Sequence, residues 1–398
     1  MEPGAAWARS GIVPLTGRPG GPPRMPPGRA AALAAELADR FAAVTGVAID
    51  GPALLSERAA FTDHRRRGRI SAGGSCRLLP TADGWAAVSC ARPDDPSLLG
   101  ALIGAETGAD PWPAVTAWLA RHTGAELAER AEPLGIAAGP IARPAAWSPD
   151  LATAARPVRD LLVVDFSALW AGPLCAHLLG LAGARVIKVE TPDRPDGARR
   201  GDPAFYDLLH AGHRSVVLDP GTADGRAALR ALVDAADIVI EASRPHALAR
   251  WGLDAREAVA AGTAWISITA HGRSSQRVGF GDDIAASCGL VARDGDGSPL
   301  FAGDAIADPL TGLAAAVLAL RPEPRLHDLA MGPLIAATLP DHSPAPSPAP
   351  SPAAFQDGDG WMIETEQGAL PVAVPRRRSP AGRAPRSGEH TAAVLKEL

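Results

Sequence analysis

LLVVDFSALWAGPLCAHLLGLAGARVIKVE, residues 161–190, is the stretch that decides the fold. Its two ends, 161–166 and 184–190, are continuous apolar runs of strand length. The segment between them, from Pro173 to Ala182, has a helical pattern. Two strands that are buried on both faces and joined by a crossover helix form a βαβ unit, in which the strands are parallel.

The same alternation of strand and helix continues downstream. Apolar runs predict the strands and amphipathic patterns predict the helices, with strands at 215–219, 237–242 and 264–270 and helices at 224–235 and about 245–260. We therefore expect the α/β class, with a Rossmann-like open parallel sheet that has helices on both faces. A strongly helical stretch follows at 311–320.

The part of the chain before this sheet has a different pattern. Residues 29–45 carry apolar side chains at helical spacing and predict an amphipathic helix. Two short apolar runs on either side of residues 81–84 predict a hairpin, and two further helices are expected at 112–122 and 124–134. These elements are typical of a smaller α+β domain.

Changes in composition divide the chain into four expected segments. The Pro/Ser/Ala repeat near residue 345 cannot pack a core and is typical of an extended linker. The segments are a small α+β domain at 1–150, a Rossmann-like domain at 158–335, a Pro-rich linker at 340–355, and a C-terminal return segment with a final helix at 356–398.

Composition narrows the class of function. A formal net charge of −5 does not indicate a nucleic-acid binder, so a small-molecule substrate is expected. The four cysteines are far apart and form no C-x-x-C pair, which predicts a reducing compartment and no metal site. No leader and no apolar run of membrane-spanning length is visible, so we expect a cytoplasmic protein without a membrane partner.

The most specific local feature is Asp308, which Pro309 and a helix follow. Asp before Pro is the usual pair for an N-cap and a first helical position, so a capping role is the simplest interpretation. A carboxylate at a helix start could also be presented to a thioester, with free N–H groups nearby for an oxyanion. The first βα turn lacks G-x-G-x-x-G, which argues against a nicotinamide cofactor.

Basic residues follow the ends of several predicted strands. Because open α/β sheets bind ligands at the carboxyl ends of their strands, some of these cations could meet the phosphates of a nucleotide. The residues are Lys188, Arg194, Arg199, Arg200, Arg214, Arg244 and Arg250.

Several motifs resemble those of the family III CoA transferases, the CaiB/BaiF family, which includes formyl-CoA transferase and α-methylacyl-CoA racemase. They are LLVVDFSALWAGPLCAHLLGLAGARVIKVETPD, HRSVVLD, DIVIEASRPHALARWGLD and GDAIADPLTG, in this order from about 160 to 320. Residues 70–142 resemble the family's small domain, and ARSGIVPLTGRPGGPP (8–23) resembles the stretch before its catalytic aspartate. Since both precede the α/β domain here, residues 1–150 are interpreted as the rear part of a second, degenerate copy.

The resemblance implies roles for single residues. Asp308 matches the catalytic aspartate, whose carboxylate attacks an acyl-CoA thioester and then carries CoA as an aspartyl thioester to a carboxylic acid. Coenzyme A is a substrate here, no tightly bound cofactor or metal is implied, and a homodimer is expected. The residues that match CoA contacts are Leu169, Trp170, Leu218, Arg250 and Trp251.

Departures from the family pattern bear on the reaction. Trp170 stands where formyl-CoA transferase has a glutamine, which argues against an oxalate-type acceptor. Phe280 and Gly281 stand where the racemase has a histidine base, so transfer is favoured over racemisation, although Asp282 or Asp283 could substitute. A 2-methylacyl-CoA racemase and a non-catalytic CoA-binding relative remain the alternatives.

Overall fold

The computed structural model describes residues 1–150, 154–242, 247–340 and 349–398. Half of the predicted Pro-rich linker, residues 341–348, lies outside the described residues, as does Arg244. Among the helices of the described residues, none combines the length and the apolar character needed to cross a membrane.

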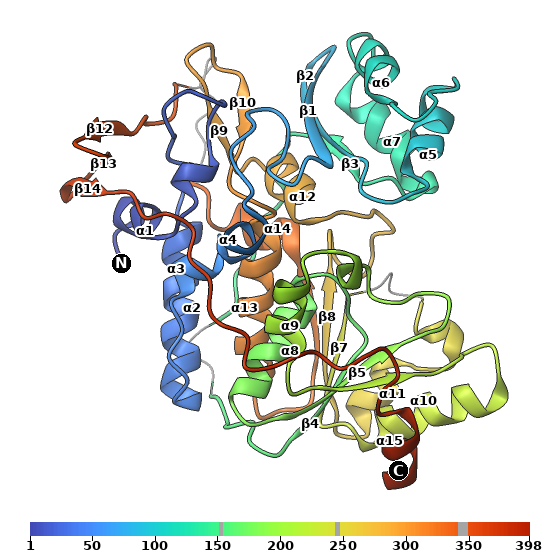
Figure 1. The fold of residues 1–398 in the computed structure, drawn as a ribbon. Coiled ribbons are helices and arrows are strands. Elements are labelled where there is room, and N and C mark those ends of the chain that lie inside the picture. The colour runs from blue at the N-terminus through green and yellow to red at the C-terminus, as the bar shows by residue number, and fades with distance from the viewer. Residues whose placement is uncertain (151–153, 243–246, 341–348) are drawn as a thin grey trace.

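A six-stranded parallel sheet forms the centre of the fold, in the order β11-β8-β7-β4-β5-β6 (Figure 1). This confirms the predicted α/β class. Five strands lie where the apolar runs predicted them, whereas β11 was not predicted. The strands are β4 (Leu162–Asp165), β5 (Arg185–Glu190), β6 (Arg214–Val217), β7 (Ile238–Glu241), β8 (Ala264–Thr269) and β11 (Leu326–Ala330).

Helices cover both faces of this sheet because successive strand residues point to opposite sides. Val163 packs with α8 (Ala171–Leu181) and α13 (Ala307–Ala319), whereas Val164 packs with α10 (Ala223–Ala235). The first face also carries α9 (Pro203–His210), which was not predicted, and α14 (Met331–Ala336); the second carries α11 (Ala255–Ala260) and the C-terminal α15 (Thr391–Glu397). The short 3-10 helices η2 (Gly197–Arg200) and η3 (Ala249–Trp251) complete this part.

The N-terminal helices share the core of the large sheet. The predicted amphipathic helix is present as α2 (Ala30–Thr45) and packs against α13. Residues of α1 (Pro3–Arg9) and α3 (Gly51–Leu54) belong to the same cluster of buried side chains. The chain on both sides of residue 150 therefore builds one core, and the predicted division into domains stays a prediction.

A second sheet, β1-β2-β3, forms with three helices a smaller unit with its own apolar cluster. The hairpin predicted around residues 81–84 is confirmed by the pairing of its first two strands. Both predicted helices are also present, and Gly135 ends the second of them in the left-handed region. The elements are β1 (Cys76–Thr81), β2 (Gly84–Ser89), β3 (Ala138–Pro140), α5 (Asp95–Ile103), α6 (Trp112–Leu119) and α7 (Gly124–Leu134).

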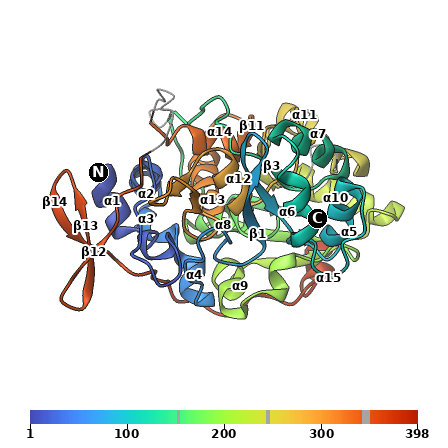
Figure 2. The ribbon, with the colours of Figure 1, turned by 90° about the horizontal axis from the view of Figure 1, so that it is seen from above.

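A third sheet, β12-β13-β14, follows the linker and was not predicted. It lies beside α1 and apart from the six-stranded sheet in both views (Figure 1, Figure 2). Its strands are β12 (Phe355–Asp357), β13 (Gly360–Thr365) and β14 (Gly368–Pro371). The remaining elements are η1 (Val13–Leu15), α4 (Glu57–Thr62), α12 (Gly281–Ser287), and the β9–β10 hairpin (Val291–Arg293 and Pro299–Phe301).

The close packing of α13 on α8 can be tested by a substitution at Gly312. A methyl group added at Gly312 would lie 2.5 Å from the Ala171 carbonyl oxygen and 3.0 Å from Leu174 Cβ. Gly312→Ala must therefore separate the two helices, and we expect it to lower the free energy of unfolding by about 1–3 kcal/mol. Urea unfolding followed by circular dichroism measures this. Gly295→Ala, where the methyl group meets open space, should leave the midpoint near that of wild type.

Candidate active site

The loop after β4 is held in a strained conformation. Leu169 has φ +71°, in the left-handed region that residues other than glycine rarely adopt, and its side chain is 44% exposed. Its amide donates to Asp196 Oδ1 at 2.9 Å, a contact that holds this conformation. Strained residues of this kind cluster at functional sites, and this loop lies at the carboxyl edge of the sheet, where α/β proteins bind ligands.

A buried lysine holds this loop in place. Lys188, on β5 and 1% exposed, lies 2.9 Å from Asp196 Oδ2 and 3.6 Å from Asp165 Oδ2. It also donates to the carbonyl oxygen of Ser167. Asp165 in turn accepts from the Ser167 amide at 2.8 Å, so the two carboxylates that Lys188 neutralises hold the backbone of the loop at Ser167 and at Leu169.

The charges in this cluster depend on one another. Burial opposes ionisation of Asp196, but the Lys188 ammonium group and hydrogen bonds lower the pKa of Asp196 below its usual range. Burial raises the pKa of Asp165, with Lys188 opposing the rise. Burial likewise disfavours the charged form of Lys188, yet the two carboxylates raise its pKa above the usual value. Lys188 is therefore a structural cation, and its predicted role as a phosphate contact is wrong.

Asp308 is the second residue of α13, and the N-cap position belongs to Ile306, which makes no side-chain cap. The predicted capping role is therefore wrong. The Asp308 carboxylate instead accepts a hydrogen bond from the amide of Gly281, at the start of α12. Asp308 is half-buried, and its carboxylate does not cap its own helix.

Two further aspartates and two basic residues surround Asp308. Asp282 Oδ1 accepts from the Ala305 amide at 2.8 Å. Asp304 is fully buried and forms a two-pronged pair with Arg58, with Nε to Oδ2 at 2.9 Å and Nη2 to Oδ1 at 2.5 Å. His64 Nδ1 lies 3.2 Å from Asp304 Oδ2.

The carboxyl groups of this acid cluster, Asp282, Asp304 and Asp308, differ in proton affinity. Burial raises the pKa of Asp308 to about 7, with Arg58 opposing the rise and the other two carboxylates adding to it. Burial also raises the pKa of Asp282. For Asp304 burial has the same sign, but the Arg58 guanidinium and the His64 ring outweigh it and lower the pKa. The pKa of Asp308 therefore lies above that of an ordinary carboxyl group.

Trp170 connects the acid cluster to the first βα loop. The residue is 2% exposed, and its ring meets Phe205 edge-on with ring centroids 5.4 Å apart. The Arg58 guanidinium carbon lies 4.9 Å from the centroid of the Trp170 ring. The indole thus packs under the arginine that holds Asp304, and its predicted contact with coenzyme A stays a prediction.

The other predicted CoA contacts follow different strands at the same edge of the sheet. Leu218 follows β6 and is buried, and the half-buried Trp251 packs against the apolar cluster to which Leu218 belongs. Arg250, beside it in η3, is exposed. The carboxyl ends of parallel strands share one edge, so these residues and the loop at Leu169 lie along the same side of the sheet.

Of the other predicted phosphate-binding residues, two have carboxylate partners. Arg199 pairs with Glu190, and Arg214 pairs with Glu397. The described basic residues that keep exposed side chains at this edge are Arg194, Arg200 and Arg250.

Arg58 and His64 were not predicted as site residues. They lie 246 and 240 positions before Asp304, and no motif in the sequence links the two regions. The sequence signal that could have found them is weak. It is the basic stretch DHRRRGR at 63–69, which follows a short helix.

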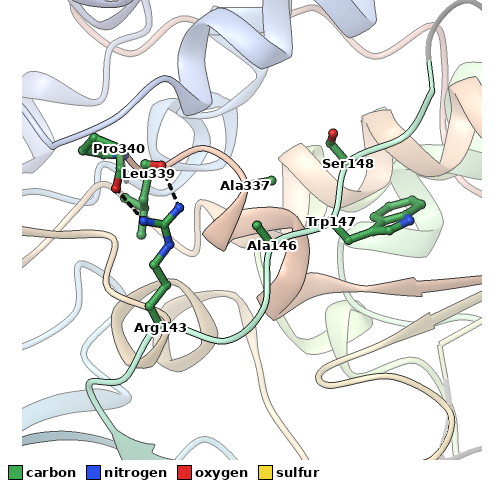
Figure 3. A pocket seen from close by; sticks show the side chains of 7 residues that line it. All are labelled: Arg143, Ala146, Trp147, Ser148, Ala337, Leu339 and Pro340. Carbon is green, nitrogen blue, oxygen red and sulfur yellow. Dashed lines mark hydrogen bonds between the residues drawn. The ribbon is translucent and has the colours of Figure 1, made fainter. Parts of the chain in front are cut away.

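A surface pocket of about 370 Å³ lies elsewhere, beside the end of α14 (Figure 3). The Arg143 guanidinium crosses it and donates to the carbonyl oxygens of Ala336 and Leu339, both at 2.8 Å. None of its lining residues belongs to the acid cluster or to the predicted CoA contacts. They are Arg143, Ala146, Trp147, Ser148, Ala337, Leu339 and Pro340.

The parallel sheet with its acid cluster at the start of α13 agrees with what sequence comparison finds. Residues 158–321 match the family described as CoA-transferase family III. The match includes Asp308 and every predicted CoA contact.

Two curated relatives are named as CoA-transferases. The chain is 34% identical over 179 residues to a succinyl-CoA–D-citramalate CoA-transferase of Chloroflexus aurantiacus, covering 42% of this chain and 44% of the relative. It is 33% identical over 177 residues to a succinate–glutarate CoA-transferase of Agrobacterium fabrum, covering 39% and 44%. The chain thus spans less than half the length of these curated relatives.

Among solved structures, a CaiB/BaiF family protein from Brucella suis is similar at 26% sequence identity and a TM-score of 0.46. The similarity covers 53% of this chain and 66% of that protein.

Lys188→Met tests the anchoring of the first βα loop. The substitution leaves two buried carboxylates without their cation, so we expect the free energy of unfolding to fall by about 3–5 kcal/mol. Thermal and denaturant unfolding measure the loss. Arg214→Met removes a surface pair with the exposed Glu397, and its unfolding midpoint should stay near that of wild type. Equal midpoints for both variants would contradict the anchoring role.

Proposed function

We propose that this chain transfers coenzyme A from an acyl-CoA thioester to a carboxylic acid, with Asp308 as the nucleophile. The observation that carries the proposal is the half-buried Asp308 at the carboxyl edge of the sheet, where its carboxylate accepts from the Gly281 amide and is flanked by the other carboxyl groups of the acid cluster. The match to CoA-transferase family III supports the same chemistry. The relatives named above transfer CoA between acids, but the match covers less than half of each of them.

The reaction requires four bond exchanges. An Asp308 carboxylate oxygen attacks the thioester carbonyl carbon, and the carbon–sulfur bond breaks to give a mixed anhydride and CoA thiolate. The thiolate attacks the aspartyl carbonyl carbon and releases the first carboxylate, which leaves an aspartyl-CoA thioester. The acceptor carboxylate attacks that thioester and again frees CoA thiolate. Finally the thiolate attacks the new acyl carbonyl carbon, which forms the product thioester and regenerates the Asp308 carboxylate.

Leu169, Trp170, Leu218, Arg250 and Trp251 are proposed to bind coenzyme A along the same edge. Arg250 is exposed and suited to a phosphate, and Trp251 beside it offers an aromatic face to the adenine ring. The names of the relatives pair succinate with a second acid, so dicarboxylates are the first acceptors to test. The predicted homodimer and cytoplasmic location stay predictions.

Racemisation of a 2-methylacyl-CoA is the second candidate function. Asp282 and Asp308 are neighbouring carboxyl groups whose pKa values burial raises, and such a pair could exchange a proton with a substrate α-carbon. Incubation of a chiral acyl-CoA in deuterated water separates the two reactions. Deuterium at the α-carbon without any acceptor acid would favour racemisation.

Asp308→Asn should abolish transfer. We expect the rate of CoA transfer from succinyl-CoA to a panel of dicarboxylic acids to fall at least about 10³-fold, because an amide cannot form the anhydride. Hydroxylamine should trap wild-type protein as an aspartyl hydroxamate at position 308, detected by peptide mass spectrometry. Asp234→Asn, on the exposed end of α10, serves as the control. Full activity of Asp308→Asn would rule out Asp308 as the nucleophile, whereas a wild-type protein with neither transfer nor hydroxamate would be a non-catalytic CoA-binding relative.

The pH dependence of the first half-reaction should report Asp308. The carboxylate is the reactive form and its pKa is raised to about 7, so the rate should fall as pH drops through 7 and be about tenfold lower at pH 6 than on its plateau. Release of succinate from succinyl-CoA in a single-turnover, rapid-mixing experiment measures this rate. A rate that stays constant down to about pH 5 would show that Asp308 behaves as an ordinary carboxylate.

A further inference from the structure

Arg58 reaches the acid cluster from a distant part of the chain. It lies on α4, in the N-terminal segment, whereas Asp304 precedes α13. Both nitrogen-to-oxygen contacts of their pair are of hydrogen-bond length, 2.9 and 2.5 Å, which fixes the plane of the carboxylate as well as its charge. The Arg58 side chain is 25% exposed, whereas the Asp304 side chain is fully buried. Arg58 therefore covers Asp304 on the side of the N-terminal segment.

The surroundings of Arg58 place its charge close to Asp308. Asp282 on α12, Asp304 before α13 and Asp308 on α13 are the carboxylates that act on one another in this cluster. Facing them are the guanidinium of Arg58 and the ring of His64, both from the N-terminal segment. Of the influences on Asp308 that favour its ionised form, Arg58 is the largest.

Two segments of the chain share one backbone arrangement. The helices α1 and α12 each have seven residues, and each is followed after one residue by a glycine at positive φ, Gly11 or Gly289. Helix α1 packs against β13 and β14, and α12 packs against β2 and β3. Each segment is therefore covered by a small sheet that follows the other segment in the chain.

Backbone hydrogen bonds between the segments repeat as well. The Met25 amide donates to the Pro352 carbonyl oxygen at 2.9 Å, and the Phe301 amide donates to the Gly68 carbonyl oxygen at 3.0 Å. Met25 lies five residues before the start of α2 and Phe301 six residues before the start of α13, and each donates to a segment of the other half. This exchange supports the hypothesis that the N-terminal part is a second copy of the unit around α13.

The N-terminal copy lacks the acids. The acidic residues occupy positions two and three of α12 and position two of α13. The same positions of α1 and α2 hold Gly4, Ala5 and Ala31, so no corresponding acid centre exists at these positions. What the N-terminal copy does supply is Arg58 and His64, which face the acids of the other copy.

We infer that Arg58 is a positioning residue for Asp308, supplied within the same chain by an N-terminal copy that has no acid centre of its own. The inference rests on the proposed function. Arg58 neutralises and orients Asp304, which lowers the cost of placing the negative charge needed for attack on Asp308. The N-terminal segment is then part of the active site and not an appendage.

The test uses the full chain and the pH profile of succinate release from succinyl-CoA in a single turnover. Arg58→Ala should move the acid limb of the profile upward by at least about one pH unit, because loss of a nearby cation disfavours the Asp308 carboxylate. The rate at pH 6 should then fall about tenfold or more, while the rate at pH 9 changes little. Arg58→Lys keeps the positive charge, so its acid limb should lie close to that of wild type. Arg65→Ala, at an exposed arginine that pairs with the exposed Asp63, is the control.

Arg58→Ala leaves a buried Asp304 unpaired, so Arg58→Ala with Asp304→Asn is the companion variant for the case in which the single variant does not fold. The acid limb of the double variant should lie between those of wild type and Arg58→Ala. If Arg58→Ala does not fold, the acid limb of the double variant should lie at a higher pH than that of wild type. An equal loss of rate at every pH, or an unmoved limb in both variants, overturns the inference. Asp308→Asn measured alongside separates the two failures: if it keeps transfer, the proposed function fails, and if it is inactive while the limb is unmoved, only the role of Arg58 fails.

Discussion

The charge of Lys188, buried under the parallel sheet's carboxyl edge, is the constraint on which the site depends. A lone ammonium group could not remain charged there, and neither could Asp165 or Asp196 without it. Because the two carboxylates also accept backbone amides of the loop after β4, pairing the charges fixes the backbone at Ser167 and at Leu169. Helix α8 begins at the end of this loop, and α13 packs closely on α8 at Gly312. The position of Asp308 is thus tied to a charge cluster on the other side of the loop.

Within the acid cluster, the location of Arg58 separates the pKa values of the carboxyl groups. Asp282, Asp304 and Asp308 are all taken at least partly out of water, which favours the protonated form of each. Arg58 contacts Asp304 directly and reverses the effect there, so Asp304 stays ionised while Asp308 titrates near neutrality. Neighbouring carboxyl groups with separated pKa values are typical of sites that move protons or attack electrophiles.

The N-terminal part of the chain contributes to the site although it precedes the α/β unit. The sheet β1–β3 precedes the α/β unit in the chain and still packs on α12, next to Asp308. The hairpin β1–β2 also supplies Ser89, whose hydroxyl donates to Asp283 at 2.9 Å. Both the small sheet and α4 therefore bring side chains to the aspartates of α12 and to Asp304 from more than 190 positions away.

Local sequence pattern determined the parallel sheet and the main helices of this protein, because periodicity and apolar runs reflect burial of each element by itself. It also singled out Asp308. It misassigned that residue as a cap, since which amide a carboxylate accepts depends on the helix packed opposite, here at Gly281. The short β11 and the exposed β12–β14 sheet carried too little apolar pattern to be predicted. Only the tertiary structure joined Arg58 to Asp304 and raised the pKa of Asp308, because charge pairing and burial are set by residues far apart in the chain.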